Sequence, residues 1–140
     1  MRDLAVAKKT LTGSVTCALV KGKSVYVSSD SGIKPMMRFI AQGFDLRGFS
    51  AADKVVGKAA AALFLYAGVK AVYGEVMSAA AEAFLTAHGV MAKYKVKTDC
   101  IINRAGTGPC PMELAVEGAE TPEDAYRILY NKIQAEKRAG

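Results

Sequence analysis

The chain has 140 residues, of which 51% are hydrophobic, and its formal charge at neutral pH is +6. This length suits one compact domain with a core and is too short for two, so we expect a single domain over residues 1–140. No apolar run reaches the roughly 18 residues of a membrane span, and the first residues lack the pattern of a secretory signal. These features predict a cytoplasmic protein that does not bind membranes.

The positive charges are scattered along the chain rather than gathered in one block. A nucleic-acid surface needs basic residues on one face with aromatic rings that stack on bases, and only Tyr94 is interleaved with lysines here. We therefore expect no nucleic-acid partner. Lys93, Lys95 and Lys97 alternate along a predicted strand, and we interpret them as a solvated face or as a guard on a strand edge.

The first third of the chain predicts a helix, a hairpin and a second helix. "RDLAVAKKTL" has helical spacing and ends before Gly13. "SVTCALV" and "SVYVSS" are rich in β-branched residues and are separated by "KGK", which is typical of a hairpin. "PMMRFIAQG" begins with Pro35, and proline suits the first position of a helix.

The segment "SAADKVVGKAAAALFLYAG" predicts one helix over residues 50–67. Ser50 and Asp53 stand at the spacing of a capping box, and Gly68 ends the apolar pattern. The second half of the segment carries no charge, so we expect it to be buried nearly all round.

The last half of the chain continues with alternating elements. "VKAVYGEVM" predicts a strand, "SAAAEAFLTAHG" a helix and "VMAKYKVK" another strand. "TPEDAYRILYNKIQAEKRAG" predicts a final helix with Thr121 as its cap and Pro122 in its first turn. Alternating strands and helices after a hairpin predict an α/β fold, a three-layer α/β/α arrangement with a mixed sheet.

The order of these elements over about residues 14–100 resembles the cytidine-deaminase-like fold. The segments "DKVVGKAAA" and "NRAGTGPCPME" more closely resemble an uncharacterised bacterial family, a domain of unknown function within that superfamily. That resemblance spans most of the chain. It implies the fold, and members of the superfamily often form oligomers.

The resemblance does not extend to the zinc ligands. Zinc deaminases hold the metal with a His or Cys and two further Cys, and a Glu beside the first ligand moves protons. "DKVVGKAAA" and "VMSAAAEA" stand where these motifs are expected and contain no ligand set. "PCPME" comes a whole strand later and has Glu113 at the second cysteine position. His88 ends a helix, where a dipole-satisfying or surface role is expected, so we predict no metal site and no cofactor.

One candidate site lies around Lys54 and Lys58, which share a face of the predicted helix. Two lysines near a helix N-terminus conflict with its dipole unless an anion or an acidic partner compensates. Gly57 inside an alanine-rich helix suggests that something approaches the backbone closely. The alternative is that both lysines reach solvent while Asp53 merely caps the helix.

The other candidate site is "NRAGTGPCPMEL", residues 103–114. Pro111 suits the first position of a helix, which makes Cys110 the N-cap and places Glu113 where it can reach back to the N–H of that cap. The thiolate of Cys110 would be favoured there and near Arg104, so it is a candidate nucleophile. The alternative is an ordinary turn with a buried thiol.

Three cysteines at irregular spacings argue against a disulfide framework, and we interpret Cys17 and Cys100 as packing residues. Gly106 and Gly108 leave the turn open, so its N–H groups could reach a phosphate or a carbonyl. Asp53, Lys58 and Glu113 are the candidate proton handlers.

These segments give the first hypothesis, a pocket that binds a small anionic metabolite, such as a nucleotide-like molecule, with Cys110 as the nucleophile if the protein is an enzyme. The residues expected there are Asp53, Lys54, Gly57, Lys58, Asn103, Arg104, Gly106, Gly108, Cys110 and Glu113. The alternative is a non-catalytic ligand-binding or regulatory domain. Helices of small residues permit close pairing, so a homo-oligomer is expected in either case.

Overall fold

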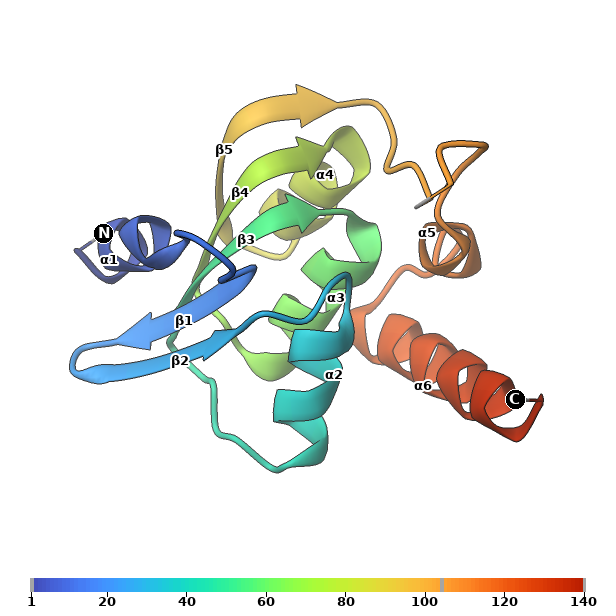
Figure 1. Ribbon diagram of the computed structural model, residues 1–140, viewed down its shortest axis with the longest axis horizontal. Helices are drawn as coiled ribbons and strands as arrows, with labels where there is room; N and C mark the ends of the chain where they lie inside the picture. Colours follow the sequence, from blue (N-terminus) through green and yellow to red (C-terminus); the bar gives the residue numbers. More distant parts are fainter. Residues whose placement is uncertain (1, 104, 140) are drawn as a thin grey trace.

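The computed structural model describes residues 2–103 and 105–139 and has a five-stranded sheet at its centre (Figure 1). The strands, in chain order, are β1 (Cys17–Lys21), β2 (Ser24–Ser28), β3 (Ser50–Val56), β4 (Ala71–Ser78) and β5 (Met91–Thr98). Their order in the sheet is β2-β1-β3-β4-β5. β1 runs antiparallel to β2 and β3, whereas β3, β4 and β5 are parallel, so the sheet is mixed.

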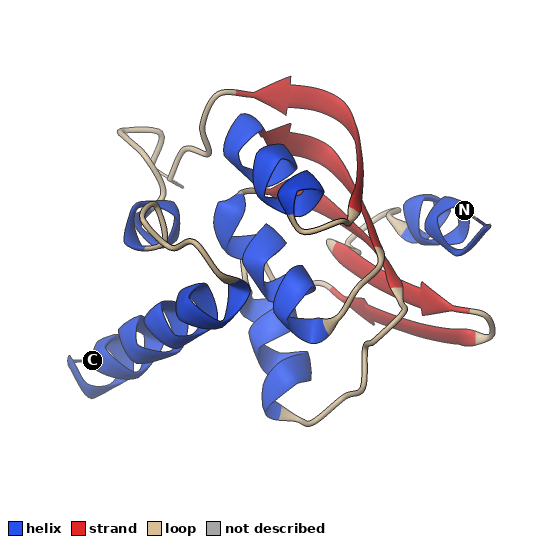
Figure 2. Cartoon of the chain, turned by 180° about the vertical axis from the view of Figure 1, so that it is seen from behind, coloured by secondary structure: helices blue, strands red, loops and turns tan. Residues whose placement is uncertain are grey.

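Helices cover both faces of this sheet. They are α1 (Arg2–Thr10), α2 (Lys34–Ala41), α3 (Lys58–Ala67), α4 (Ala79–Ala87), α5 (Pro111–Ala115) and α6 (Pro122–Ala139). α1 packs Leu4 and Ala7 against one face, and α2, α3 and α4 lie on the other (Figures 1 and 2). The predicted α/β fold with a mixed sheet is therefore confirmed.

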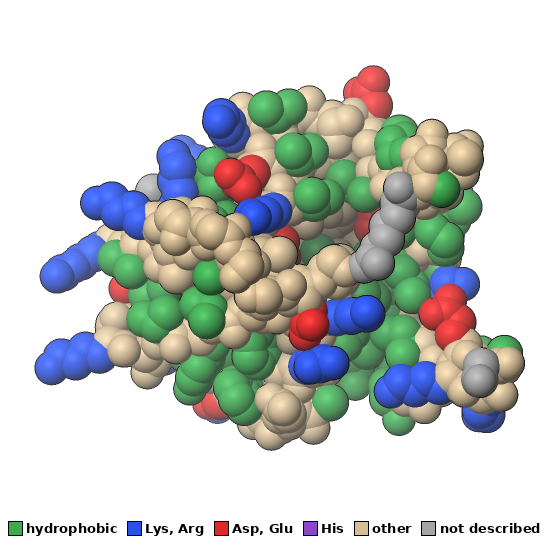
Figure 3. All heavy atoms as spheres, viewed as in Figure 1, with side chains coloured by type: hydrophobic (Ala, Val, Ile, Leu, Met, Phe, Trp, Pro, Cys, Tyr) green, Lys and Arg blue, Asp and Glu red, His purple; other side chains and the backbone are tan. Residues whose placement is uncertain are grey.

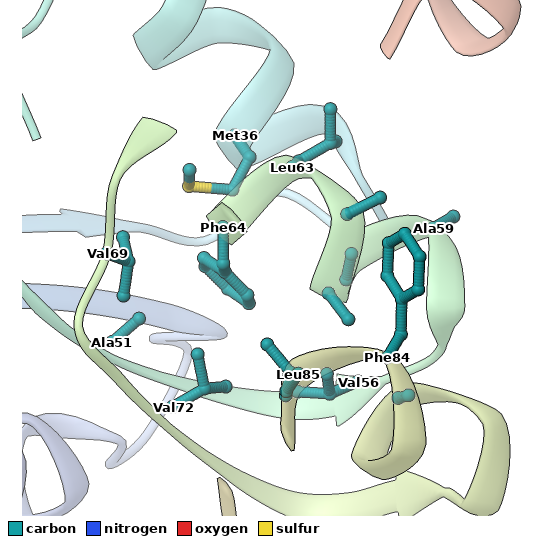
Figure 4. Close-up of a cluster of buried hydrophobic side chains, with 14 of the residues drawn as sticks. Met36, Ala51, Val56, Ala59, Leu63, Phe64, Val69, Val72, Phe84 and Leu85 are labelled. Atoms are coloured by element: carbon teal, nitrogen blue, oxygen red, sulfur yellow. The ribbon is translucent and has the colours of Figure 1, made fainter. Parts of the chain in front are cut away.

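The larger core surrounds α3, as the absence of charge in its sequence predicted. Leu63 and Phe64 are fully buried between the sheet, α2 and α4 (Figure 4). Burying each of these side chains contributes about 1.5–3 kcal/mol. The four consecutive alanines, residues 59–62, are also buried inside the chain itself, so they offer no free surface for subunit pairing. The expected homo-oligomer stays a prediction.

The predicted helix over residues 50–67 is wrong in its first half. Residues 50–56 form β3, a central strand between β1 and β4, and α3 begins only at Lys58 with Gly57 as its N-cap. A short apolar run fits a buried strand as well as a helix, and only the partner strands decide between them. Ser50 is therefore no cap: its hydroxyl is buried and, within the described residues, has no hydrogen-bond partner.

β5 is an edge strand, as its alternating lysines indicated. Most of its side chains are exposed, including Lys93 and Lys95. Lys97 forms an ion pair with Glu82 of α4, with 2.9 Å between Nζ and Oε1.

α6 packs on α3 with its first half only. Pro122, Ala125 and Leu129 are buried, whereas no residue beyond Tyr130 is, and the helix projects from the body of the molecule (Figure 1). The Oγ of Thr121 accepts a hydrogen bond from the N–H of Asp124, which confirms Thr121 as the cap. Within residues 2–103 and 105–139, no helix is long and apolar enough to cross a membrane.

Candidate functional site

A cleft of about 610 Å³ lies between α4 and the segment that connects β5 to α6. Figure 2 shows this side of the molecule, with α4 beside the loop that leads to α5. Ligands of open α/β sheets commonly bind beyond the carboxyl ends of parallel strands, where helices begin. The residues that line the cleft are Lys58, Ser78, Ala80, Ala83, Phe84, Ala87, His88, Asp99, Cys100, Ile101, Pro109, Glu113, Leu114, Glu117, Ala119 and Glu120.

The wall of the cleft is largely apolar, and its charges are mostly negative. Carboxylates come from Asp99, Glu113, Glu117 and Glu120, whereas Lys58 is the one lysine among the lining residues. The chain as a whole carries a formal charge of +6. The described lining residues therefore carry a net charge of the opposite sign from that of the whole protein.

Glu113 ties α5 to the start of α3. Its Oε1 accepts the N–H of Lys58 at 2.6 Å and its Oε2 accepts the N–H of Ala59 at 3.0 Å. A helix N-terminus leaves such N–H groups without intrahelical partners and favours a negative charge. Glu113 is thus the acidic partner of this helix start.

Gly57 makes this contact possible. A Cβ atom at this position would lie 2.4 Å from the carboxyl carbon of Glu113, closer than real Cβ atoms come to other atoms. The φ of Gly57 is −96°, which any residue adopts, so the glycine serves close approach rather than backbone conformation. The sequence predicted a close approach at Gly57, and the group that approaches is the carboxylate of Glu113.

The predicted capping box within α5 is wrong. Glu113 does not bond to the N–H of Cys110, because that N–H donates to the carbonyl of Ile101 at 3.0 Å. The carboxylate instead caps a different helix. Burial raises the pKa of Glu113, while its hydrogen bonds from Ala59 and Lys58 and the charge of Lys58 act in the opposite direction.

The ammonium group of Lys58 is held at the wall of the cleft. Its Nζ donates to the carbonyl of Glu117 at 3.0 Å and lies 5.0 Å from the ring centre of Phe84. These contacts join α3, α4 and the segment after α5 around one side chain.

Cys110 is the N-cap of α5 with Pro111 after it, as predicted, but its side chain makes no capping hydrogen bond. It is half-buried and is absent from the residues that line the cleft. The exposed thiol of Cys100, which we had interpreted as a packing residue, does line the cleft.

Asn103 stabilises its own turn. Its Nδ2 donates to the Oγ1 of Thr107 at 3.2 Å, and its Oδ1 accepts the N–H of Thr107 at 3.1 Å. Gly106 has a φ of +72°, which favours glycine, and a Cβ at Gly108 would meet open space. The predicted role of Arg104 falls outside the described residues.

Asp53 and Lys54 do not line the cleft. Asp53 is buried in β3 opposite Cys17 of β1, and its carboxylate accepts the N–H of Val55 at 3.3 Å. Burial raises the pKa of Asp53 to about 8. The Nζ of Lys54 donates to the carbonyl of Gly13 at 3.1 Å, so the predicted shared helix face of Lys54 and Lys58 does not exist.

The two segments chosen from the sequence do meet, because Glu113 contacts the first residues of α3. The contribution of α4 and of the acidic residues Asp99, Glu117 and Glu120 was missed. One signal could have found it: Ser78 follows a predicted strand and caps the next helix by accepting the N–H of Ala81. His88 ends that helix with Nδ1 2.9 Å from the carbonyl oxygen of Phe84, in line with its predicted role.

Among the described residues, no group of three or more His, Cys, Asp or Glu side chains could hold a metal ion. The model of one protein family, described as "Domain of unknown function (DUF1893)", matches residues 5–133. No curated protein matches the chain. A DUF1893 family protein (TM1506) from Thermotoga maritima, known from a crystal structure, is 28% identical in sequence to this chain. The two structures have a TM-score of 0.79, and the match covers 92% of this chain and 86% of that one.

Two deaminases are weakly similar. The dCMP deaminase of cyanophage S-TIM5 is 13% identical, with a TM-score of 0.45 over 66% of this chain and 94% of that one. The diaminohydroxyphosphoribosylaminopyrimidine deaminase/5-amino-6-(5-phosphoribosylamino)uracil reductase of Thermotoga maritima is 18% identical, with a TM-score of 0.44 over 68% of this chain and 34% of that one.

Proposed function

The chain belongs to the DUF1893 family, a domain of unknown function, and from its cleft we propose that it binds a small, flat molecule that is neutral or positively charged. Small-molecule sites are concave and mostly apolar, with a few polar groups that fix orientation. The observation that carries the proposal is the wall of the cleft, where alanines and Phe84 stand beside four carboxylates and one lysine. Such a wall accepts an apolar ring whose edge carries N–H donors.

The anionic ligand expected from the sequence, such as a nucleotide-like molecule, is the competing proposal. It drew its support from a helix N-terminus with Lys54 and Lys58 beside it, and from the turn that contains Asn103, Arg104, Gly106 and Gly108. In the structure the carboxylate of Glu113 accepts the first N–H groups of α3, and Lys54 bonds to Gly13 instead. Among the described residues that line the cleft, Lys58 is the one group with a positive charge to attract an anion. These contacts favour a neutral or cationic ligand over an anionic one.

Three ring compounds of matched shape test the charge of the ligand. Benzamidine, benzamide and benzoate carry charges of about +1, 0 and −1 at neutral pH on the same flat framework. Each is titrated into the protein while backbone amide resonances are followed by NMR. Benzamidine is expected to shift resonances of Ala83, Phe84 and Leu114 at the lowest concentration, then benzamide, then benzoate. The reverse order would favour the anionic ligand, and no shift in the cleft with any compound would contradict binding there.

Matched variants separate the charge of the cleft from the charge of the protein. Glu117→Gln and Glu120→Gln are each expected to weaken the binding of benzamidine several-fold and to leave the affinity for benzamide unchanged. Glu136→Gln changes the net charge by the same amount on α6, away from the lining residues, and serves as the control. Equal weakening by all three variants would show that the net charge of the protein, not the cleft, attracts the cation.

A second candidate function is covalent chemistry at Cys110. The observation in its favour is that the thiol makes no capping hydrogen bond at the N-cap position. α5 has only 5 residues, so its dipole stabilises a thiolate less than a longer helix would. Alkylation by iodoacetamide across pH, in Cys100→Ser and Cys110→Ser variants, tests this candidate. A nucleophilic Cys110 reacts faster than a free model thiol, and a reaction that Cys100→Ser abolishes would assign the reactivity to Cys100.

A further inference from the structure

A second pocket lies on the opposite face of the sheet, beside α1. Its volume is about 350 Å³, and it is lined by Lys8 and Leu11 at the end of α1, Tyr73 and Glu75 of β4, and Lys95 of β5. α1 packs on β1, β3 and β4 and leaves β5 uncovered on this face. The pocket occupies the angle between the end of the helix and this uncovered part.

The lysines of this pocket are available to a ligand. Within the part of the chain that the structure describes, neither Lys8 nor Lys95 has an ion-pair partner, whereas Lys97 pairs with Glu82. The Nζ of Lys8 lies 4.9 Å from the ring centre of Tyr73. Lys93 is the partner of Tyr73 in the register of β4 and β5. Basic side chains gather at the end of the molecule that carries α1 (Figure 3).

The pocket also contains hydrogen-bonding groups of other kinds. Glu75 contributes a carboxylate, which accepts hydrogen bonds and repels anions. Burial, together with the charge of Glu75, raises the pKa of Tyr73, so its phenol keeps its proton and can donate. A simple inorganic anion would meet the two lysines but would leave the carboxylate unused.

We propose that this pocket binds a small phosphorylated molecule whose hydroxyl groups lie next to its phosphate. The phosphate contacts the ammonium groups of Lys8 and Lys95, and a hydroxyl group donates to Glu75. Lysine binds phosphate as a compact point charge with three donors. A volume of about 350 Å³ suits a small molecule rather than a polymer. This site does not depend on the function proposed for the cleft.

Three probes test the two halves of this recognition. Glycerol 3-phosphate carries phosphate and hydroxyls, inorganic phosphate carries the anion alone, and glycerol carries the hydroxyls alone. In NMR titrations, glycerol 3-phosphate is expected to shift amide resonances of Tyr73, Glu75 and Lys95 and to bind several-fold more tightly than phosphate. Glycerol is expected to cause no shift. Shifts confined to the cleft, or none near β4 and β5, would overturn the proposal.

Charge-matched variants separate the pocket from the general field of a basic protein. Lys8→Ala and Lys95→Ala are each expected to raise the dissociation constant of glycerol 3-phosphate at least five-fold, about the effect of losing one ordinary hydrogen bond. Lys23→Ala removes the same charge from the turn between β1 and β2 and is expected to change this dissociation constant less than two-fold. Equal effects of all three variants would overturn the site.

Glu75→Ala tests the role of the carboxylate. Removing this negative charge is expected to increase the affinity for inorganic phosphate several-fold, because the carboxylate no longer repels the anion. The preference for glycerol 3-phosphate over phosphate is expected to disappear, because the acceptor of the hydroxyl is gone. A preference that survives Glu75→Ala would overturn the assigned ligand class, whereas unfolding of the variant would be recognised from its amide spectrum. If Glu75→Ala unfolds, Glu75→Gln replaces it, because glutamine keeps a hydrogen-bond acceptor without the charge. This variant must bind inorganic phosphate more tightly than the wild type and must still prefer glycerol 3-phosphate over phosphate.

Discussion

The two pockets stand on opposite faces of one sheet, and the described residues that line them carry opposite net charge. The cleft beyond β4 and β5 has four carboxylates and one lysine, whereas the pocket beside α1 has two lysines and one carboxylate. β4 contributes to both, with Ser78 to the first and Tyr73 and Glu75 to the second. A net charge of +6 therefore describes neither site. The distribution of charge over faces, rather than its sum, decides what each pocket attracts.

The pockets also differ in how they are held together. The pocket beside α1 follows from the alternation of side chains on neighbouring strands and from the packing of α1. The cleft needs a segment that returns late in the chain, and Glu113 fastens that segment to α3. A single substitution should therefore open the cleft while the other pocket persists.

The largest expected effect acts on the stability of the whole fold, through Asp53 in the central strand β3. Its pKa is raised from 3.8 to about 8 by burial, so between these values the folded state holds a proton that the unfolded state has lost. Stability then falls as pH rises through this window, by about 4 kcal/mol between pH 5 and pH 9. Asp53→Asn should flatten this decline, measured by urea unfolding at pH 5, 7 and 9. Parallel curves for the two proteins would show that Asp53 does not titrate in this range.

The next largest effect distinguishes the pockets. Glu113→Ala leaves the N–H groups of Lys58 and Ala59 without their acceptor and should lower the free energy of unfolding by about 2–4 kcal/mol. It should also abolish the benzamidine shifts and preserve those of glycerol 3-phosphate. Glu113→Gln keeps one acceptor oxygen and should lose about half as much stability. Equal loss of both responses would show that the pockets are not independent.

Gly57→Ala sharpens the assignment of Glu113. The added methyl group would overlap the carboxylate and should cost about 1–3 kcal/mol. In the Glu113→Ala background the same substitution should cost less, because the overlap is gone, and a double-mutant cycle measures the difference. Gly108→Ala is the control, since a Cβ there meets nothing within 4 Å. Strict additivity would show that Gly57 and Glu113 do not interact.

The smallest effect on stability concerns the charge of the cleft. Lys58→Met keeps an apolar stem of similar length and removes the only lining lysine, so the free energy of unfolding should change by less than about 1 kcal/mol. Benzamidine should bind several-fold more tightly and benzoate more weakly, while glycerol 3-phosphate binds as before. NMR titration of all three compounds checks this result. Unchanged affinities would mean that Lys58 does not contribute to the field in the cleft.

Much of the fold could be predicted because local patterns state it directly. The β-branched residues on both sides of a short turn predict the hairpin of β1 and β2. The capping threonine, the acidic first turn and the basic last turn predict α6. Residues 50–56 were assigned to a helix because small residues suit both states. Their conformation is decided by β1 and β4, which the segment itself does not contain.

The site was predictable only in part, and for a similar reason. The spacing around Glu113 correctly indicates an acid that caps a helix, but the helix it caps begins 55 residues earlier in the chain. No local pattern identifies that partner. The exposed alanines of α4 carry no local signal of a site, and they form a cleft wall because the segment after β5 stands opposite them.

The projecting half of α6 is a suitable site for attaching a label. Residues 131–139 contribute no buried side chain, and no residue of α6 lines either pocket. A fluorophore, a biotin or a surface tether attached there would leave the ligand sites on both faces of the sheet unobstructed. The same immobilised sample could then report on both binding reactions, so their affinities would be compared under identical conditions.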